Sequence, residues 1–195
     1  MKKRRARRRR RLGLLVAALA AGAVVLVAVL AVTGVFDKAL QELTLPLRHE
    51  DIIRQQAREK DVDAALIAAV IYSESKFVDQ TSSAGARGLM QITPEAANEI
   101  ERLSGGTSFE LEDLADPEIN IRYGTFLLHV LLERFDGDEA AALAAYNAGP
   151  SNAEEWGGAE LSVGEIPFPE TRAYVEEVLE KRDAYRGEYG RELGY

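Results

Sequence analysis

Residues 64–77 read AALIAAVIYSESKF and form the most hydrophobic stretch that follows the N-terminal segment. Eight consecutive apolar residues lead through a tyrosine and a serine to Glu74. A stretch that is apolar on nearly every face predicts a buried helix, and Asp61 or Asp63 can cap its start. Glu74 is therefore expected near the C-terminal end of this helix, just before a loop.

Two effects are expected to raise the pKa of Glu74. Desolvation disfavours the charged carboxylate, and the partial negative charge at a helix C-terminus opposes a second negative charge. A glutamic acid that stays protonated near neutral pH can act as a general acid. The alternative interpretation is that Glu74 marks the point where the helix reaches solvent, since charged side chains are mostly exposed.

The surrounding sequence predicts further helices and no sheet. The glycine-containing stretch 79–88, DQTSSAGARG, predicts a loop. Thr93-Pro94 and Asp116-Pro117 have the form of helix starts. The predicted helices cover 48–60, the run that ends at Glu74, the segment from Pro94, 117–135, 138–148 and 171–186. Gly149-Pro150 is expected to stop the helix before it. The predicted fold class is all-α.

The N-terminal 36 residues differ from the rest in composition. Residues 1–11 hold nine of the 24 basic side chains and no acid, and residues 12–36 hold no charge. As a helix, those 25 residues would span about 37 Å, enough for a ~30 Å hydrocarbon core. We therefore predict one N-terminal transmembrane helix at 12–36, an uncleaved signal anchor, with the basic segment 1–11 in the cytoplasm. A nucleic-acid-binding patch is the alternative for the arginine run.

The remaining chain is strongly acidic. It carries 15 basic and 32 acidic residues, a net charge of −17, and the whole chain has no cysteine. Such a charge repels phosphate backbones, so we expect no nucleic-acid partner. Without disulfides, packing must hold the domain together. The two histidines, His49 and His129, lie on separate predicted helices without metal-ligand spacing, so we expect neither a metal nor another cofactor.

Polar side chains cluster at three further places. Ser82 and Ser83 supply hydroxyls and Gln91 an amide in and after the glycine loop, which suits a neutral ligand rich in hydroxyl and amide groups. An ordinary tight turn is the alternative. The other two places are the ends of later helices, with Tyr146 and Asn147 at one and Glu170 at the other. Each has an ordinary structural explanation as part of a helix end.

Four motifs together resemble the Slt-type lytic transglycosylase domain, whose members share the goose-type lysozyme-like fold. They are ES at 74–75, GARGLMQITPEAA at 85–97, AYNAGPSN at 145–152 and IPFPETRAYVEEVL at 166–179. They occur in the family's order and cover roughly residues 48–186. The resemblance implies cleavage of the β-1,4 bond between N-acetylmuramic acid and N-acetylglucosamine in peptidoglycan.

The resemblance also assigns residue roles. Glu74 is the single catalytic acid and base, and Ser82 or Ser83 lies near the substrate N-acetyl group. The other positions that match the family's substrate-binding residues are Gly88, Met90, Gln91, Tyr146, Asn147 and Glu170. No metal is implied. The expected partners are peptidoglycan glycan strands and, through the N-terminal helix, the membrane, while protein partners stay unknown.

One carboxylate is sufficient for this reaction. Most glycosidases use two, but the muramic C6 hydroxyl can replace water as the attacking group and give a 1,6-anhydromuramic acid end. Two alternatives remain open at this point. One is a lysozyme-like hydrolase with Asp79 or Glu170 as a second acid, and the other is a non-catalytic wall-binding or scaffold protein.

The predicted organisation follows from these points. A basic cytoplasmic segment (1–11) precedes the anchor (12–36), a linker (37–46) and a lysozyme-like helical catalytic domain (47–195). This places the chain in the cytoplasmic membrane of a bacterium as a single-pass protein, with its N-terminus inside and its catalytic domain on the cell-wall or periplasmic side.

Overall fold

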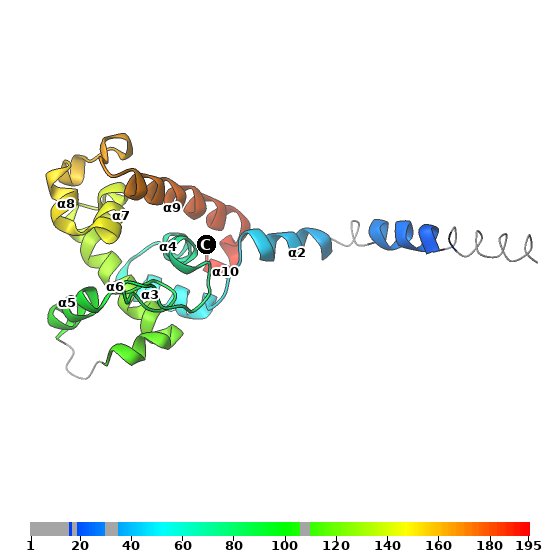
Figure 1. Ribbon diagram of the computed structural model, residues 1–195, viewed down its shortest axis with the longest axis horizontal. Helices are drawn as coiled ribbons and strands as arrows, with labels where there is room; N and C mark the ends of the chain where they lie inside the picture. Colours follow the sequence, from blue (N-terminus) through cyan, green and yellow to red (C-terminus); the bar gives the residue numbers. More distant parts are fainter. Residues whose placement is uncertain (1–15, 17–18, 30–34, 106–109) are drawn as a thin grey trace, which may run out of the picture. The chain divides into compact units, whose positions relative to one another are not determined.

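The computed structural model describes residues 16, 19–29, 35–105 and 110–195 (Figure 1). The chain divides into two compact units, Met1–Leu45 and Pro46–Tyr195. In the first unit, residues 19–29 are helical with exposed side chains, and helix α2 spans Val35–Thr44. The segment 37–46, predicted as a linker, is therefore mostly helical.

No helix among the described residues is both long enough and apolar enough to cross a membrane. Residues 12–15, 17–18 and 30–34 of the predicted span 12–36, and all of the basic segment 1–11, lie outside the described residues.

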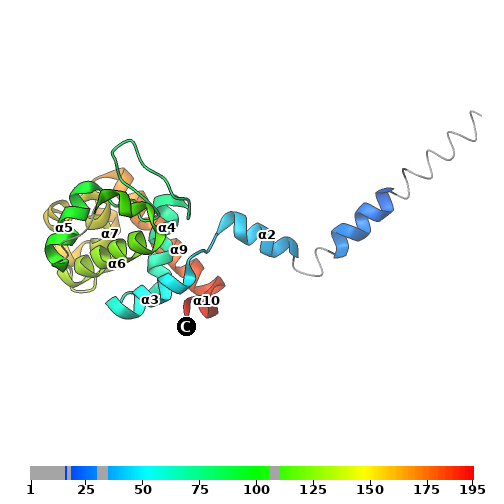
Figure 2. The same ribbon diagram turned by 90° about the horizontal axis from the view of Figure 1, so that it is seen from below.

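The second unit consists of helices joined by short 3₁₀ turns (Figures 1 and 2). Its α-helices are α3 (Glu50–Lys60), α4 (Ala64–Ser75), α5 (Pro94–Ser104), α6 (Pro117–Arg134), α7 (Glu139–Ala148), α8 (Pro150–Glu155), α9 (Pro169–Glu188) and α10 (Gly190–Leu193). The 3₁₀ turns are η1 (Leu111–Ala115), η2 (Gly158–Glu160) and η3 (Val163–Glu165). Within residues 35–105 and 110–195, the only extended pairings are two isolated bridges, Thr81–Arg87 and Arg87–Ile92. The all-α prediction is confirmed.

Capping residues set the helix starts as the sequence predicts. Asp63 accepts a hydrogen bond from the Ala65 N–H at the start of α4, and Asp61 instead ends α3 in a left-handed conformation. Thr93 and Asp116 cap the next two long helices, each with proline in the first turn. These caps fix where each apolar run enters the core.

Two helix boundaries differ from the prediction. Pro150 begins helix α8 instead of following a stop, because proline at the first position of a helix gives up only an N–H that has no helical partner there. Helix α9 begins at Pro169, two residues earlier than expected, for the same reason.

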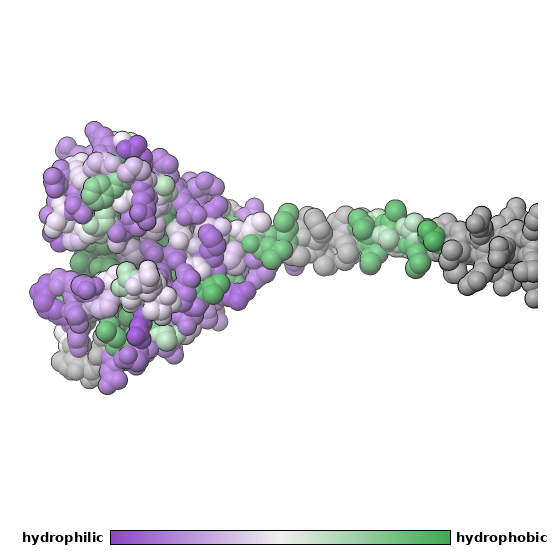
Figure 3. Space-filling model, viewed as in Figure 1, coloured by the Kyte–Doolittle hydropathy of each residue, from purple (hydrophilic) through white to green (hydrophobic). Residues whose placement is uncertain are grey.

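Helix α4 is the centre of the unit. Its residues from Ala64 to Ile71 are all buried, and it packs chiefly against α9. Figure 1 shows α4 between α7–α9 on one side and α5–α6 on the other. In Figure 3 the surface is hollowed between these two groups, with apolar residues inside the hollow. The burial of α4 thus brings its C-terminal end, with Glu74, into the middle of the fold.

Candidate active site

Glu74 lies in the last turn of α4 and is half-buried. Burial raises the pKa of its carboxyl to about 7, and a weaker interaction with the Tyr174 hydroxyl opposes that shift. Glu74 is therefore protonated in a large share of molecules at neutral pH. The direction and the main cause of the predicted pKa shift are confirmed.

Two tyrosines face this carboxyl from separate helices. Tyr146 lies in the last turn of α7 and Tyr174 lies in α9, and Glu74 acts electrostatically on both. Burial raises the pKa of both hydroxyls well above the usual value, and the nearby Glu74 raises them further. Both tyrosines thus stay protonated. Both hydroxyls are thus close enough to interact electrostatically with the carboxyl, and the Tyr174 hydroxyl can donate a hydrogen bond to it.

The Tyr174 hydroxyl is buried, and no described group completes a hydrogen bond of standard geometry to it. Its interaction with the Glu74 carboxyl therefore falls short of standard hydrogen-bond geometry and is open to tightening when the carboxyl loses its proton. Tyr174 is not among the site residues predicted from the sequence. Its position could have identified it as a site residue, because Tyr174 follows Glu170 by one helical turn in the same motif.

The loop between α4 and α5 is fastened to the end of α4. The Ser75 hydroxyl lies 2.7 Å from the Leu89 carbonyl oxygen, and the Gln80 amide donates to the Glu74 carbonyl oxygen over 3.3 Å. Gln91, at a φ of 46°, donates both amide hydrogens, to the carbonyl oxygens of Gly88 and Gln80. Only the side-chain oxygen of Gln91 is left for a ligand.

Met90 is buried and held from two sides. Its N–H donates to the Asn120 side-chain oxygen over 2.8 Å, and its carbonyl oxygen accepts a hydrogen bond from the Tyr146 hydroxyl over 2.9 Å. Gly124 of α6 lies directly against it, where a Cβ would be 2.8 Å from the Met90 Cβ. Met90 therefore connects the loop to both α6 and α7.

Asn120 of α6 is a buried polar residue that the sequence analysis missed. Besides the Met90 bond, its amide donates to the carbonyl oxygens of Arg87 and Leu114, over 2.9 and 3.0 Å. Gly88 passes so close that a Cβ there would overlap the Asn120 amide and come within 2.5 Å of the Leu114 oxygen. The glycine in the motif is thus needed for close approach, and at a φ of 75° as well.

Asn147 and Glu170 line an adjoining pocket of about 460 Å³, together with Phe168. Asn147 follows Tyr146, and Glu170 precedes Tyr174 by one turn, so the pocket is lined by residues of α7 and α9 that neighbour the two tyrosines in sequence. Both side chains are exposed at its rim.

The two serines differ. Ser82 is half-buried and its hydroxyl oxygen accepts a hydrogen bond from the Ala86 N–H over 3.1 Å, whereas Ser83 is exposed. Asp79 is exposed as well. Within residues 35–105 and 110–195, no group of three or more histidine, aspartate and glutamate side chains is placed to hold a metal ion.

The model of the Transglycosylase SLT domain matches residues 51–166. The chain belongs to the SLT transglycosylase domain family. It is 35% identical over 158 residues to the soluble lytic murein transglycosylase of Salmonella typhimurium, and 34% identical over 153 residues to that of Escherichia coli K12. Both matches cover 74% of this chain and 24% of the relative, so the chain spans about a quarter of their length.

Solved SLT structures have the same fold. The lytic transglycosylase Slt of Pseudomonas aeruginosa superposes with a TM-score of 0.72 at 31% identity, over 77% of this chain and 26% of that one. The 70 kDa soluble lytic transglycosylase of Escherichia coli gives a TM-score of 0.72 at 31% identity, over 78% and 26%. The family identified from four motifs, and its all-helical lysozyme-like fold, are confirmed.

Proposed function

We propose that this chain is a lytic transglycosylase that cleaves the β-1,4 bond between N-acetylmuramic acid and N-acetylglucosamine in peptidoglycan. The observation that carries the proposal is Glu74, a half-buried carboxyl with a pKa of about 7 that interacts with two buried tyrosine hydroxyls. The names of the relatives agree with it, as does the Pseudomonas aeruginosa structure, which is of an inactive mutant with glutamine in place of a glutamate.

In the first step, protonated Glu74 donates its proton to the glycosidic oxygen, and the bond to the anomeric carbon breaks. The N-acetyl group of the muramic acid stabilises the positive charge that develops there. In the second step, the Glu74 carboxylate accepts the proton of the muramic C6 hydroxyl, whose oxygen attacks the anomeric carbon. Glu74 thus gives up one proton in the first step and takes one back in the second, and no water is consumed.

The neighbours of Glu74 are assigned supporting roles. Tyr174 stabilises the carboxylate that exists between the two steps, because hydrogen bonds to a charged acceptor are stronger than those to a neutral one. Tyr146 holds the Met90 carbonyl oxygen beside the site. Gln91 and Met90 shape the wall of the site, with Ser82 near the substrate N-acetyl group. Asn147 and Glu170 bind the glycan strand in the adjoining pocket. The rigid placement of the hydroxyl that attacks favours ring closure over hydrolysis.

Mass analysis of peptidoglycan digested by the full chain tests the reaction type. We expect fragments that end in 1,6-anhydromuramic acid, each lighter by one water than the corresponding hydrolysed fragment. Fragments with reducing ends only would assign the chain to the hydrolases, and an absence of fragments in spite of binding would identify a wall-binding protein.

The pH profile tests the state of Glu74. Because the first step needs protonated Glu74, kcat/KM is expected to fall as pH rises through about 7. Tyr174→Phe removes the interaction that lowers the pKa of Glu74, so the fall should move to higher pH. Tyr72→Phe, which removes a hydroxyl two residues before Glu74, should leave the profile in place. An unmoved profile in Tyr174→Phe would contradict the assignment.

The N-terminal segment is proposed to anchor the enzyme in the cytoplasmic membrane, with the catalytic unit on the wall side. The support is the uncharged stretch 12–36 behind nine basic residues, and some relatives are named membrane-bound, such as lytic murein transglycosylase F of Cellvibrio japonicus. The full chain should remain in the membrane fraction after alkaline extraction, and its release into solution would contradict the anchor.

A further inference from the structure

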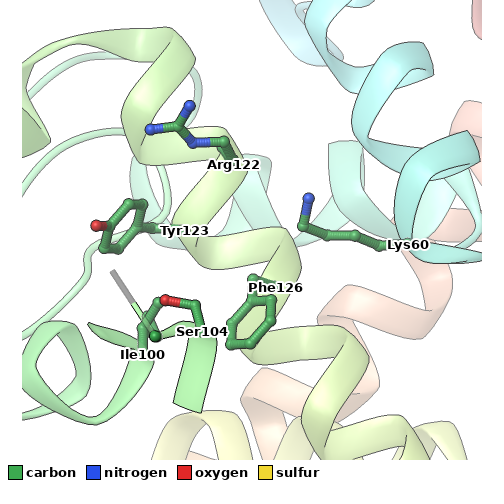
Figure 4. Close-up of a pocket in the computed structure, with 7 residues that line it drawn as sticks. Lys60, Ile100, Ser104, Arg122, Tyr123 and Phe126 are labelled. Carbon is green, nitrogen blue, oxygen red and sulfur yellow. The ribbon is translucent and has the colours of Figure 1, made fainter. Parts of the chain in front are cut away.

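A second pocket, of about 360 Å³, lies between the ends of α3 and α5 and the side of α6 (Figure 4). Its volume is within the range of small-molecule sites, about 300–1,000 Å³. Its lining residues are Lys60, Ile100, Ser104, Gly105, Arg122, Tyr123 and Phe126. None of the residues assigned to the reaction is among them.

Helix geometry separates this pocket from the active site. Asn120 and Gly124 contact Met90, whereas Arg122 and Phe126 each follow one of them by two residues. Two residues correspond to a rotation of about 200° on an α-helix, so the pocket lies on the opposite face of α6. A ligand bound there would not touch Glu74.

The pocket combines two cations with apolar surface. In Figure 4 the ring of Phe126 lies between Lys60 on one side and Ser104 and Tyr123 on the other. Ile100, at 2% exposure, adds buried apolar surface. The pocket therefore suits an anionic group, with apolar surface beside it for the body that carries that group.

Lys60 retains donor capacity. Its side chain is only 15% exposed, and its ammonium donates to the Gln56 side-chain oxygen over 2.6 Å, while the Glu59 carboxylate lies 3.8 Å away. An ammonium has three N–H donors, and Gln56 uses one of them. Burial, and then the nearby Arg122, lower the pKa of Lys60, whereas Glu59 opposes them. An anion between the two cations would relieve their repulsion.

Arg122 is the stronger candidate for anion recognition. Its guanidinium lies 5.9 Å from the Tyr123 ring centre, and no carboxylate of the described residues lies within 4.0 Å of it. The nearby Glu59 carboxylate instead accepts from the Gln55 and Gln56 amides, over 2.8 and 3.0 Å. The planar guanidinium matches a carboxylate or phosphate with two parallel N–H bonds.

We propose that this pocket is an accessory site that binds a carboxylate or phosphate group of the cell wall, on the face of α6 opposite Met90. The inference rests on the proposed function, since a peptidoglycan-cleaving enzyme meets both groups in its polymer: free carboxylates on peptide stems and phosphates on wall-linked polymers. Such a site would hold the enzyme on the wall independently of the strand being cut.

Calorimetry on the full chain in detergent tests the site. The probes are N-acetyl-alanyl-alanine with a free C-terminal carboxylate, the same peptide as its carboxamide, and inorganic phosphate. We expect the chain to bind the carboxylate peptide or phosphate, but not the carboxamide. Binding of the peptide alone would identify peptide stems as the source, and binding of phosphate alone would identify phosphate polymers. Binding of neither would overturn the proposal.

Variants locate the binding. Arg122→Gln should weaken it by at least about tenfold, the loss expected for charge-assisted hydrogen bonds. Arg58→Gln removes the same charge from an exposed position of α3 outside the pocket and should leave the affinity unchanged. Equal affinities in wild type and Arg122→Gln, or equal losses in both variants, would overturn the assignment, with melting curves checking that each variant folds.

The same titrations in Glu74→Gln separate this inference from the proposed function. Binding of the probes to the accessory pocket does not require cleavage of peptidoglycan. If the digestion products carry no anhydro ends while the carboxylate peptide binds, the reaction type is wrong and the anion site stands. If anhydro ends form and neither probe binds, only the accessory site is wrong.

Discussion

Glu74→Gln is expected to lower peptidoglycan cleavage on the order of 10³-fold, because general acid–base catalysis contributes about 10²–10⁴-fold and this one group serves both steps. Glutamine has nearly the shape of the protonated acid but can neither donate the proton nor accept it. The measurement is the rate at which anhydro-ended fragments appear. The matched control is Glu176→Gln, an exposed carboxylate of α9, which should keep wild-type activity.

The same variant should fold normally, and its stability has a predictable sign. The pKa of Glu74 is raised from 4.5 to about 7 in the folded chain, so its protonated form stabilises the fold below pH 4.5 and that contribution is lost as pH rises through about 7. Glutamine carries no charge at either pH. Glu74→Gln should therefore melt at or above the wild-type temperature at pH 8. Activity within about tenfold of wild type would contradict the catalytic assignment.

Asn120→Ala is expected to cost about 3–5 kcal/mol of folding stability. Its three hydrogen bonds to Met90, Arg87 and Leu114 are buried, and leaving such partners unsatisfied costs roughly 1–3 kcal/mol each. The melting temperature should fall on the order of 10 °C. Because Met90 contacts both α6 and Tyr146, activity should fall even below the melting transition.

The control for this variant is Asn98→Ala, an exposed position of α5, which should shift the melting temperature by only about 1–2 °C. An Asn120→Ala variant as stable as this control would show that Asn120 does not hold the loop. In that case the positions of Met90 and Gly88 would need another explanation.

The sequence alone was sufficient for most of the helices and for the raised pKa of Glu74. The unbroken apolar run at 64–71 could only be buried, and burial of that run raises the pKa of Glu74. The N-caps at Asp63, Thr93 and Asp116 were readable because capping depends on local bonds. That Pro150 begins a new helix could not be predicted, since proline marks a stop or a start equally well.

The polar contacts around the acid depend on tertiary packing and escaped prediction. Asn120 lies 30 residues from Met90 in the chain, and the sequence of a helix carries no sign of which distant groups a polar residue in it bonds. Tyr174 lies in the same motif as Glu170, and only Glu170 was selected from that motif as a site residue. Gln91 was expected to offer its whole amide to substrate, yet the backbone uses both hydrogens.

Helix α9 carries several of these positions on one continuous helix. It carries Glu170 at the pocket rim, Tyr174 beside the acid and, further along, Tyr185, which is buried and donates to the Pro46 carbonyl oxygen over 2.6 Å. A substitution at Tyr185 that shifts this helix would also move Tyr174 and the pocket rim. Changes selected for heat tolerance at one end of α9 are therefore expected to alter glycan binding at the other end.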